Sequence, residues 1–260
     1  MNRRTPSHGP VLLNPQPRPR AAHRLVVFPH AGGSPSFYRG WSGAADPDIE
    51  VSLVQYAGRE QRIGEPPVPD ARAVAAEVSD ALRATVTRGD SRPLALFGHS
   101  MGAIIAYETA LALTDIEPSA LFVSSRRAPA TVAPRPGPVP TRTDEEILSH
   151  LRGLGSTPMS LFDNRAIRDL YLPVLRADYH LVDTYAPGPD SHTLPLPVTA
   201  LWGTEDPTAD APLMTPWRDT TTDRFRPRPF DGGHFYLVDH RDSVLKLVRE
   251  QLGADSVRTG

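Results

Sequence analysis

The sequence predicts a mostly parallel α/β fold, because short apolar runs alternate along the chain with segments of helical periodicity. Parallel strands need crossover helices, so this alternation indicates a sheet with helices on its faces. The 260 residues are 39% hydrophobic and 22% charged, an ordinary composition for a protein with a sizeable core. They correspond to one large domain or to two small ones.

Six short apolar runs are the predicted strands of this sheet. They span residues 24–29, 51–56, 94–98, 120–125, 198–203 and 224–230. The last run contains two prolines, which have no N–H to donate, and this indicates an edge strand.

Helices are predicted between these runs. Asp70 is the expected N-cap of a helix whose apolar face carries Val74, Val78 and Leu82. A second helix follows Ser100, and residues 238–252 form the closing helix. Together they complete the alternation of strand and helix.

One stretch breaks the alternation. Residues 128–141, APATVAPRPGPVPT, are too rich in proline to form a strand or a helix. Helical segments follow at 143–152 and 164–185, and Pro173 is expected to kink or divide the second. This pattern predicts an insertion of helices over the carboxyl edge of the sheet.

The predicted organisation therefore has four parts. They are a flexible tail over 1–22, an α/β core over 23–140 and 187–253, a helical lid insertion over 141–186, and a C-terminal tail over 254–260.

Charge and composition exclude several classes of function. A formal net charge of −2 provides no basic field for nucleic acid. No window approaches the roughly 18 consecutive apolar residues that a membrane span needs. The absence of cysteine excludes disulfides, thiolate catalysis and cysteine metal sites, and it favours a reducing compartment. We therefore expect a soluble, cytoplasmic protein without a metal centre.

Residues 96–104, LFGHSMGAI, place Ser100 between two glycines where a predicted strand meets a predicted helix. This is the layout of a nucleophile elbow, whose strained serine leaves no room for side chains two residues away. The helix N-terminus also favours developing negative charge. The bare motif is weak, since chance supplies it in roughly one chain in ten of this length. A structural glycine turn fits the same letters.

A serine nucleophile needs a base and an acid, which follow it in the order Asp or Glu, then His in this type of fold. Among the nine histidines, His234 lies after the last predicted strand, where Gly232 and Gly233 let the chain bend. Asp206 follows the strand at 198–203, with an Asp-Pro turn as the structural alternative. Three signals in the required order support one another and predict a Ser-His-Asp site.

Other titratable residues are less well placed for these roles. His240, near the closing helix, is the second choice of base, and His99 is expected to point away from the site. The weaker choices of acid are Asp183, Glu205 and Asp231.

Residues 28–38, FPHAGGSPSFY, are the expected second half of an oxyanion hole. Ala31 N–H and Met101 N–H are the predicted donors, from the loop after an early strand and from the residue after the nucleophile. Ser34 is the expected cap of the next helix. A plain glycine loop is the alternative, whereas a dinucleotide site lacks its Gly-x-Gly-x-x-Gly spacing.

An ordered set of segments resembles the stand-alone (type II) thioesterases of polyketide and nonribosomal peptide synthesis. The segments are FPHAGGSPSFYRGW, QYAGREQRIGEP, LALFGHSMGA, SSRRAP, ALWGTEDP and GGHFYL, and the likeness covers about residues 24–252. The family implies an α/β-hydrolase fold, with a mostly parallel central sheet flanked by helices and a helical lid. It also implies hydrolysis of aberrant or stalled acyl groups from the phosphopantetheine arm of carrier domains. One departure is Ala57-Gly58-Arg59, where the family commonly has Pro-Gly-Arg.

The resemblance implies roles for individual residues. Ser100, Asp206 and His234 correspond to nucleophile, acid and base, and the N–H groups of Ala31 and Met101 to the oxyanion donors. The candidate substrate contacts are His30, Met159, Leu161, Phe162, Leu170, Tyr171, Val174 and Tyr179, although apolar residues at helical spacing more often pack in a core.

Partners and cofactors follow from the same resemblance. The implied partners are acyl or peptidyl carrier domains, bound transiently by a monomer, and the only prosthetic group is the phosphopantetheine that the substrate carries. Arg126 and Arg127 are candidate contacts to a carrier, with solvated arginines as the alternative.

Alternative functions remain on the same scaffold, because a fold does not determine a substrate. They are a small-molecule carboxylesterase, a peptidase or acyltransferase, and a non-catalytic carrier-domain-binding protein.

Overall fold

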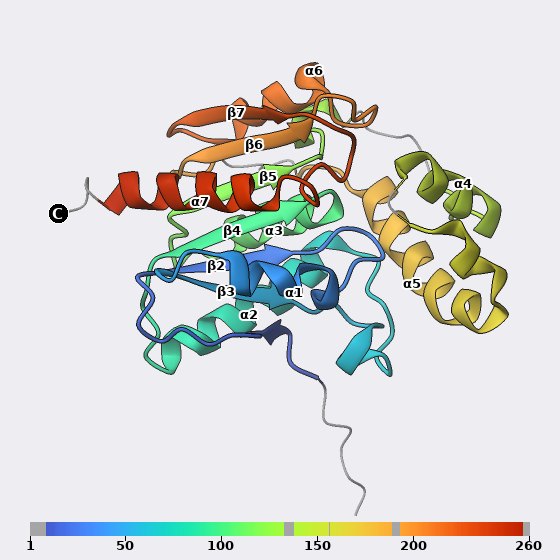
Figure 1. The fold of residues 1–260 in the computed structure, drawn as a ribbon, viewed down its shortest axis with the longest axis horizontal. Coiled ribbons are helices and arrows are strands. Elements are labelled where there is room, and N and C mark those ends of the chain that lie inside the picture. The colour runs from blue at the N-terminus through green and yellow to red at the C-terminus, as the bar shows by residue number, and fades with distance from the viewer. Residues whose placement is uncertain (1–8, 133–137, 156, 189–192, 257–260) are drawn as a thin grey trace, which may run out of the picture.

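The computed structural model describes residues 9–132, 138–155, 157–188 and 193–256 (Figure 1). Within these ranges the strands form a seven-stranded sheet in the order β1-β3-β2-β4-β5-β6-β7. They are β1 (Leu12–Leu13), β2 (His23–Phe28), β3 (Ile49–Val54), β4 (Leu94–His99), β5 (Ala120–Ser124), β6 (Val198–Gly203) and β7 (Phe225–Phe230). Neighbours from β3 to β7 pair in parallel, and β1 is antiparallel to β3. The predicted mostly parallel α/β fold is confirmed.

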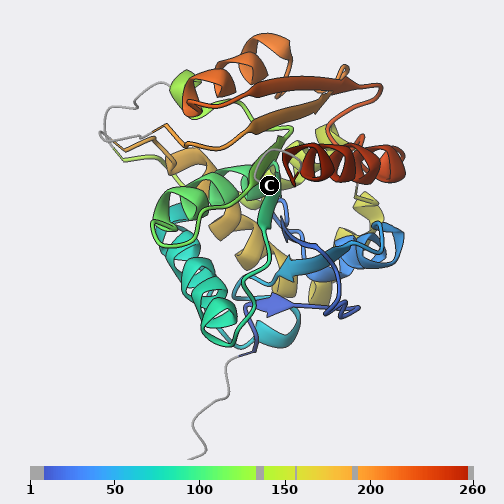
Figure 2. The ribbon, with the colours of Figure 1, turned by 90° about the vertical axis from the view of Figure 1, so that its left-hand side faces the viewer.

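Helices cover both faces of the sheet (Figure 2). Helices α1 (Pro35–Ala44) and α7 (Arg241–Ser256) lie on one face, and α2 (Ala71–Thr87) and α3 (Met101–Ala112) lie on the other. Successive side chains of β2 alternate between these layers, because strand residues point to opposite faces. Val26 packs with α2 and α3, and Val27 packs with α1 and α7.

Strand β7 is the edge strand that its prolines predict. It pairs with β6 alone among the described strands. The carbonyl of Arg224 accepts from the N–H of Val198 in β6, and that of Phe230 accepts from Thr204, which directly follows β6. The backbone N–H and C=O groups of even-numbered residues in β7 therefore point toward β6. The backbone nitrogens of Pro227 and Pro229 therefore point toward the open edge, where the missing N–H groups cost no ladder hydrogen bond.

Residues 9–22, predicted as part of a flexible tail, instead pack against the core. Leu12 pairs with Val54 in the sheet. The Arg18 guanidinium donates to the carbonyls of Ser42 at 2.8 Å and Asp46 at 2.7 Å, at the end of α1. A cation is favourable at a helix C-terminus, where carbonyls lack partners. Composition could not show this, because the acceptors lie far along the chain.

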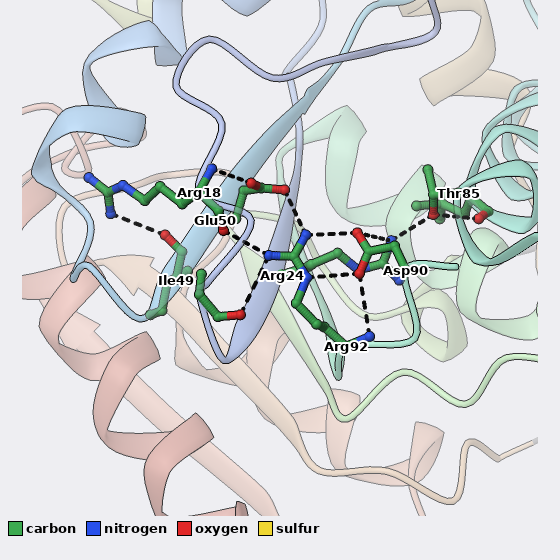
Figure 3. A network of polar contacts seen from close by, with 9 residues as sticks. Arg18, Arg24, Ile49, Glu50, Thr85, Asp90 and Arg92 are labelled. Carbon is green, nitrogen blue, oxygen red and sulfur yellow. Dashed lines mark hydrogen bonds and ion pairs between the residues drawn. The ribbon is translucent and has the colours of Figure 1, made fainter. Parts of the chain in front are cut away.

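A charge network at the amino ends of β2 and β3 holds the same segment (Figure 3). Arg92 contacts Glu50 at 2.9 Å and Asp90 at 2.7 Å, and it donates to the carbonyl of Arg18 at 2.9 Å. Arg24 lies 3.4 Å from Asp90. The network lies at the opposite end of these strands from the loops that carry the predicted site.

Between β5 and β6 the chain forms α4 (Asp144–Leu154), a 3-10 helix (Met159–Asp163) and α5 (Arg165–Thr184) (Figure 1). We call residues 144–184 the helical insertion. It has an apolar cluster of its own, which includes Ile147, Phe162 and Leu175. Pro173 does not divide α5, because it lies on the exposed side, where water can satisfy the carbonyl it leaves unpaired.

Four short elements complete the described fold. They are the 3-10 helices Glu60–Arg62 and Pro129–Thr131, and α6 (Ala211–Met214) with the adjoining 3-10 helix Thr215–Thr220. No helix in the described ranges is long and apolar enough to cross a membrane.

Candidate active site

Ser100 stands on a sharp turn between β4 and α3. Its backbone has φ 55° and ψ −118°, and residues other than glycine rarely adopt such a positive φ. Such a conformation costs about 1–3 kcal/mol and persists only where the surroundings impose it. The turn exposes Ser100 at the wall of a cavity while its N–H donates to the carbonyl of Ser124 at 2.8 Å.

The two glycines of the motif are required by contact with backbone. A Cβ on Gly98 would lie 2.2 Å from the Gly102 carbonyl oxygen, and one on Gly102 would lie 2.0 Å from the Phe28 carbonyl oxygen. These distances are far below van der Waals contact, so β4, α3 and the loop after β2 meet too closely for any side chain. The spacing therefore has the steric basis that a nucleophile elbow predicts.

His234 and Asp206 form a buried hydrogen-bonded pair. His234 Nδ1 lies 2.7 Å from Asp206 Oδ2, with side-chain exposures of 5% and 0%. Their loops also pack together, because a Cβ on Gly203 would lie 2.2 Å from the Gly233 carbonyl oxygen. Glu205 N–H donates to the carbonyl of Gly232 at 2.9 Å. The ends of β6 and β7 thus bring together two residues that the sequence separates.

Thr208 is a member of this site that sequence reasoning missed. Its N–H and Oγ1 both contact Asp206 Oδ1, at 2.9 and 2.7 Å. Burial raises the pKa of Asp206, but the hydrogen bonds from His234 and Thr208 outweigh burial and lower the pKa below its ordinary value. The Asp-Pro-Thr spacing was the available signal, since an Asp carboxylate commonly accepts from the backbone two residues on.

His99 lies behind His234 and is not among the described cavity-lining residues. Its ring is fully buried, with its centroid 5.1 Å from that of His234. Nδ1 contacts Ser124 Oγ at 2.9 Å, and Ser124 Oγ contacts Tyr236 OH at 2.8 Å. Burial and then the neighbouring His234 lower the pKa of His99 well below 6.5. His99 is therefore a neutral packing partner of His234.

The other titratable residues considered from the sequence have different surroundings. His240 packs against Phe230, with ring centroids 5.5 Å apart. Asp183 pairs with Arg142 at 2.6 Å, and Glu205 and Asp231 are exposed.

The two predicted oxyanion donors are Met101, which directly follows Ser100, and Ala31, which lines the same cavity. Met101 is the first residue of α3, so its N–H has no acceptor within the helix. Ala31 lies in the loop after β2 and lines the same cavity as Ser100. Ser34 occupies the N-cap position of α1 but makes no side-chain cap, and Glu60 accepts from Ser36 N–H at 3.0 Å instead.

A cavity of about 760 Å³ separates Ser100 and His234 from the helical insertion. Its size is in the range of small-molecule sites. Of the candidate substrate contacts, the residues that line it are His30, Leu161, Phe162, Tyr171 and Tyr179. Met159, Leu170 and Val174 are not among the described lining residues, and Met159 packs against the apolar cluster of the insertion.

Two arginines line the cavity beside Ser125. Burial, and then Arg127, lower the pKa of Arg126 to about 10, and Arg126 Nη2 contacts the carbonyl of Val182 at 3.4 Å. Arg127 is exposed. They make part of the wall cationic, and their contact with a carrier domain stays a prediction.

Comparison with known proteins identifies the family of this chain. Residues 23–252 match the family described as the thioesterase domain. The chain belongs to the thioesterase family. It is 40% identical to a probable cadicidin biosynthesis thioesterase of Streptomyces griseus over 90% of this chain and 63% of that protein. Thioesterase PikA5 of Streptomyces venezuelae is 37% identical over 91% of this chain and 83% of that protein.

A solved structure supports the same assignment. The type II thioesterase BorB, from the borrelidin biosynthetic cluster, superposes with a TM-score of 0.82 at 35% identity, over 95% of this chain and all of that one. The predicted α/β-hydrolase fold and the predicted enzyme class, a thioester hydrolase, are thereby confirmed. The chain spans less than two thirds of the cadicidin protein's length.

Proposed function

We propose that this thioesterase hydrolyses aberrant or stalled acyl groups from the phosphopantetheine arm of acyl or peptidyl carrier domains by a Ser-His-Asp mechanism. The observation that carries the proposal is the 2.7 Å contact between buried His234 and Asp206, beside the cavity that Ser100 also lines. The likeness to biosynthetic thioesterases supports the substrate class.

The proposed reaction begins when His234 Nε2 takes the proton of Ser100 Oγ as the oxygen attacks the thioester carbonyl carbon. The N–H groups of Ala31 and Met101 donate to the oxyanion. When the carbon–sulfur bond breaks, the proton passes from His234 to sulfur and the pantetheine thiol leaves. Water then attacks the acyl-serine, gives its proton to His234, and releases the carboxylic acid as Ser100 regains the proton.

Asp206 supports both steps in this proposal. Its carboxylate accepts from His234 Nδ1–H, which leaves Nε2 free to accept the serine proton. The lowered pKa of Asp206 keeps it ionised at neutral pH. It therefore stabilises the imidazolium that forms when Ser100 loses its proton.

We assign residues 141–186 as a lid over the α/β core at 23–140 and 187–253. The apolar side chains that the insertion turns to the cavity support an acyl chamber, with Phe162, Tyr171 and Tyr179 as substrate contacts. His30 contacts the chamber from the core side.

Ser100→Ala tests the proposal on a panel of acyl groups attached to a carrier domain. We expect kcat to fall by about 10⁴–10⁶-fold, as for loss of other serine nucleophiles, and a fluorophosphonate to label wild type but not the variant. Hydrolysis of the carrier thioester by Ser100→Ala at near the wild-type rate would overturn the assignment.

The same panel separates the alternatives. Turnover of simple esters without carrier thioesters would indicate a carboxylesterase, and transfer to an acceptor other than water would indicate an acyltransferase. Carrier binding without labelling of Ser100 would indicate a non-catalytic protein.

A further inference from the structure

A buried ion pair joins the α/β core to the helical insertion. Arg59, in the loop after β3, places Nη2 2.8 Å from Oδ1 of Asp178, which lies on α5. Arg59 Nη1 also lies 3.0 Å from Asp178 Oδ2, so the contact is bidentate. The side chains are 8% and 4% exposed. Neither residue takes part in the reaction proposed above.

Both members of the pair also bind the loop that carries Ala31. Asp178 Oδ2 accepts from the Gly32 N–H at 2.7 Å, and Arg59 Nη1 donates to the Gly33 carbonyl at 2.9 Å. These are the two residues that directly follow Ala31. The loop is thus held by a charged donor and a charged acceptor immediately beside the proposed oxyanion donor.

The two residues that precede Ala31 are also held by buried side chains. Tyr56 OH donates to the Pro29 carbonyl at 3.1 Å, and the Arg59 guanidinium lies 5.0 Å from the centre of the Tyr56 ring. His30 Nδ1 contacts Tyr38 OH at 2.9 Å. Every residue that flanks Ala31 is therefore tied to a buried side chain.

Helix α5 meets this loop too closely for the contact to be incidental. Gly32 has φ 73°, and a Cβ there would lie 2.5 Å from Leu175 Cδ2. Leu175 and Asp178 are three residues apart on α5, so they share a face and touch Gly32 together. Ala31 itself packs against the core cluster and the cluster of the insertion.

Stability alone is a weak reason for such a pair. Removing two charges from water costs about as much free energy as their attraction returns. Well-packed apolar residues in the same place often give a fold of equal stability. What apolar residues cannot do is accept from the Gly32 N–H and donate to the Gly33 carbonyl.

We propose that Arg59 and Asp178 are positioning residues that hold the Ala31 N–H in the oxyanion hole, so that the hole is complete only when α5 is docked on the core. The inference rests on the proposed function, because it assumes an oxyanion at Ser100. It makes the insertion part of the catalytic geometry as well as a cover for the acyl chain. A substrate that holds α5 away from Gly32 would be bound but hydrolysed slowly.

The test compares Asp178→Asn, Arg59→Lys and the double variant Arg59→Met/Asp178→Leu with wild type. The readouts are kcat and KM on an acyl-pantetheine thioester, the rate of Ser100 labelling by a fluorophosphonate, and the thermal midpoint. We expect kcat and labelling to fall 10–100-fold while KM changes less than threefold, since loss of one oxyanion donor costs about 10²–10³-fold. The double variant should keep its thermal midpoint within a few degrees of wild type and still lose kcat.

Arg176→Gln is the matched control. Arg176 lies on the same helix and is paired with Asp144 of α4, away from the Arg59–Asp178 pair in its hydrogen bonding. Its kcat should stay within threefold of wild type. If the double variant is as active as this control, or if its kcat falls only in proportion to the folded fraction, Arg59 and Asp178 are purely structural and the inference is wrong.

Two further comparisons keep the result interpretable. If Asp178→Asn does not fold, Arg59→Lys decides the question, because it keeps the charge and loses the bidentate contact. Labelling does not need a carrier. Slow labelling of the double variant therefore supports the inference even if wild type hydrolyses no carrier thioester, an outcome that would overturn only the proposed function.

Discussion

His234 Nδ1 lies 2.7 Å from Asp206 Oδ2, in a contact that water does not reach because the two side chains are 5% and 0% exposed. A carboxylate there holds one tautomer of the imidazole and one ring orientation. In Asp206→Asn the amide cannot serve as a negatively charged acceptor, and it can turn its NH₂ toward Nδ1. We expect kcat on an acyl-pantetheine thioester to fall by about 10³–10⁴-fold, as in other triads.

Glu205→Gln is the control for that substitution. Glu205 is the neighbouring acid and is exposed. Its loss should leave kcat within twofold of wild type. Equal losses in the two variants would show that general loop charge, and not the acid–base pair, supports the reaction.

Gly102→Ala tests the steric basis of the elbow. The added Cβ would lie 2.0 Å from the Phe28 carbonyl oxygen, a backbone atom that no side-chain rotation can move away. We expect a loss of about 3 kcal/mol or more in the free energy of unfolding, at the upper end of the range for overpacking a core. Urea denaturation followed by circular dichroism measures it.

Gly153→Ala provides the contrast, because Gly153 is exposed on α4 and a Cβ there meets nothing within 4 Å. Alanine is the better helix former by about 1 kcal/mol, so this variant should be at least as stable as wild type. A comparable stability of the two variants would contradict the close approach of β2 and α3.

His30 should make the folded state sensitive to acid. Burial, followed by His234 and Arg59, lowers the pKa of His30 to about 3, against an ordinary 6.5. The unfolded chain therefore binds a proton that the folded chain rejects between these values, and stability is lost as pH falls from 6.5 toward 3. One such group contributes a slope of about 1.4 kcal/mol per pH unit.

His30→Gln removes this group. We expect the free energy of unfolding, measured in urea between pH 4 and 6.5, to fall less steeply with acid than in wild type. The buried His99 adds to the slope in the same direction in both proteins. An unchanged slope in His30→Gln would mean that His30 takes up a proton as readily folded as unfolded.

Ile167→Trp tests the acyl chamber. Ile167 lines the cavity from the helical insertion, so a larger ring there should shorten the space for an acyl chain. We expect kcat/KM for a long acyl thioester to fall about tenfold or more relative to acetyl, since one methylene in an apolar pocket is worth about 1–3 kcal/mol. Kinetics on a series of chain lengths measures the ratio.

Leu170→Trp is the companion variant, three residues along the same helix. Leu170 is 44% exposed and is not among the described lining residues. Its chain-length preference should match wild type. A shift of the same size in Leu170→Trp would place the chamber elsewhere.

Several features were predictable because they depend on residues close together in the sequence. Strand and helix alternation follows from the period of apolar residues. The edge position of β7 follows from Pro227 and Pro229, and the turn at Ser100 from the glycines two residues away on either side. The sequence also shows Ser100, Asp206 and His234 in the order expected of nucleophile, acid and base. The hydrogen bond between Asp206 and His234, by contrast, is a property of the fold.

Other features could not be predicted, because their partners are distant. Residues 9–22 have the composition of a tail, yet Arg18 finds carbonyls at the end of α1. Met159 and Leu170 have the apolar character expected of the chamber, but they are not among the described residues that line the cavity.

By itself, then, the sequence determined the fold class and singled out Ser100 as the candidate nucleophile, because both depend on local residue spacing and on the steric demands of single residues. Only the tertiary structure decided what surrounds Ser100. Arg59 and Asp178 are 119 residues apart, and neither lies in a pattern that predicts the other. Their pairing depends on where α5 packs, and that is decided by the burial of whole apolar faces.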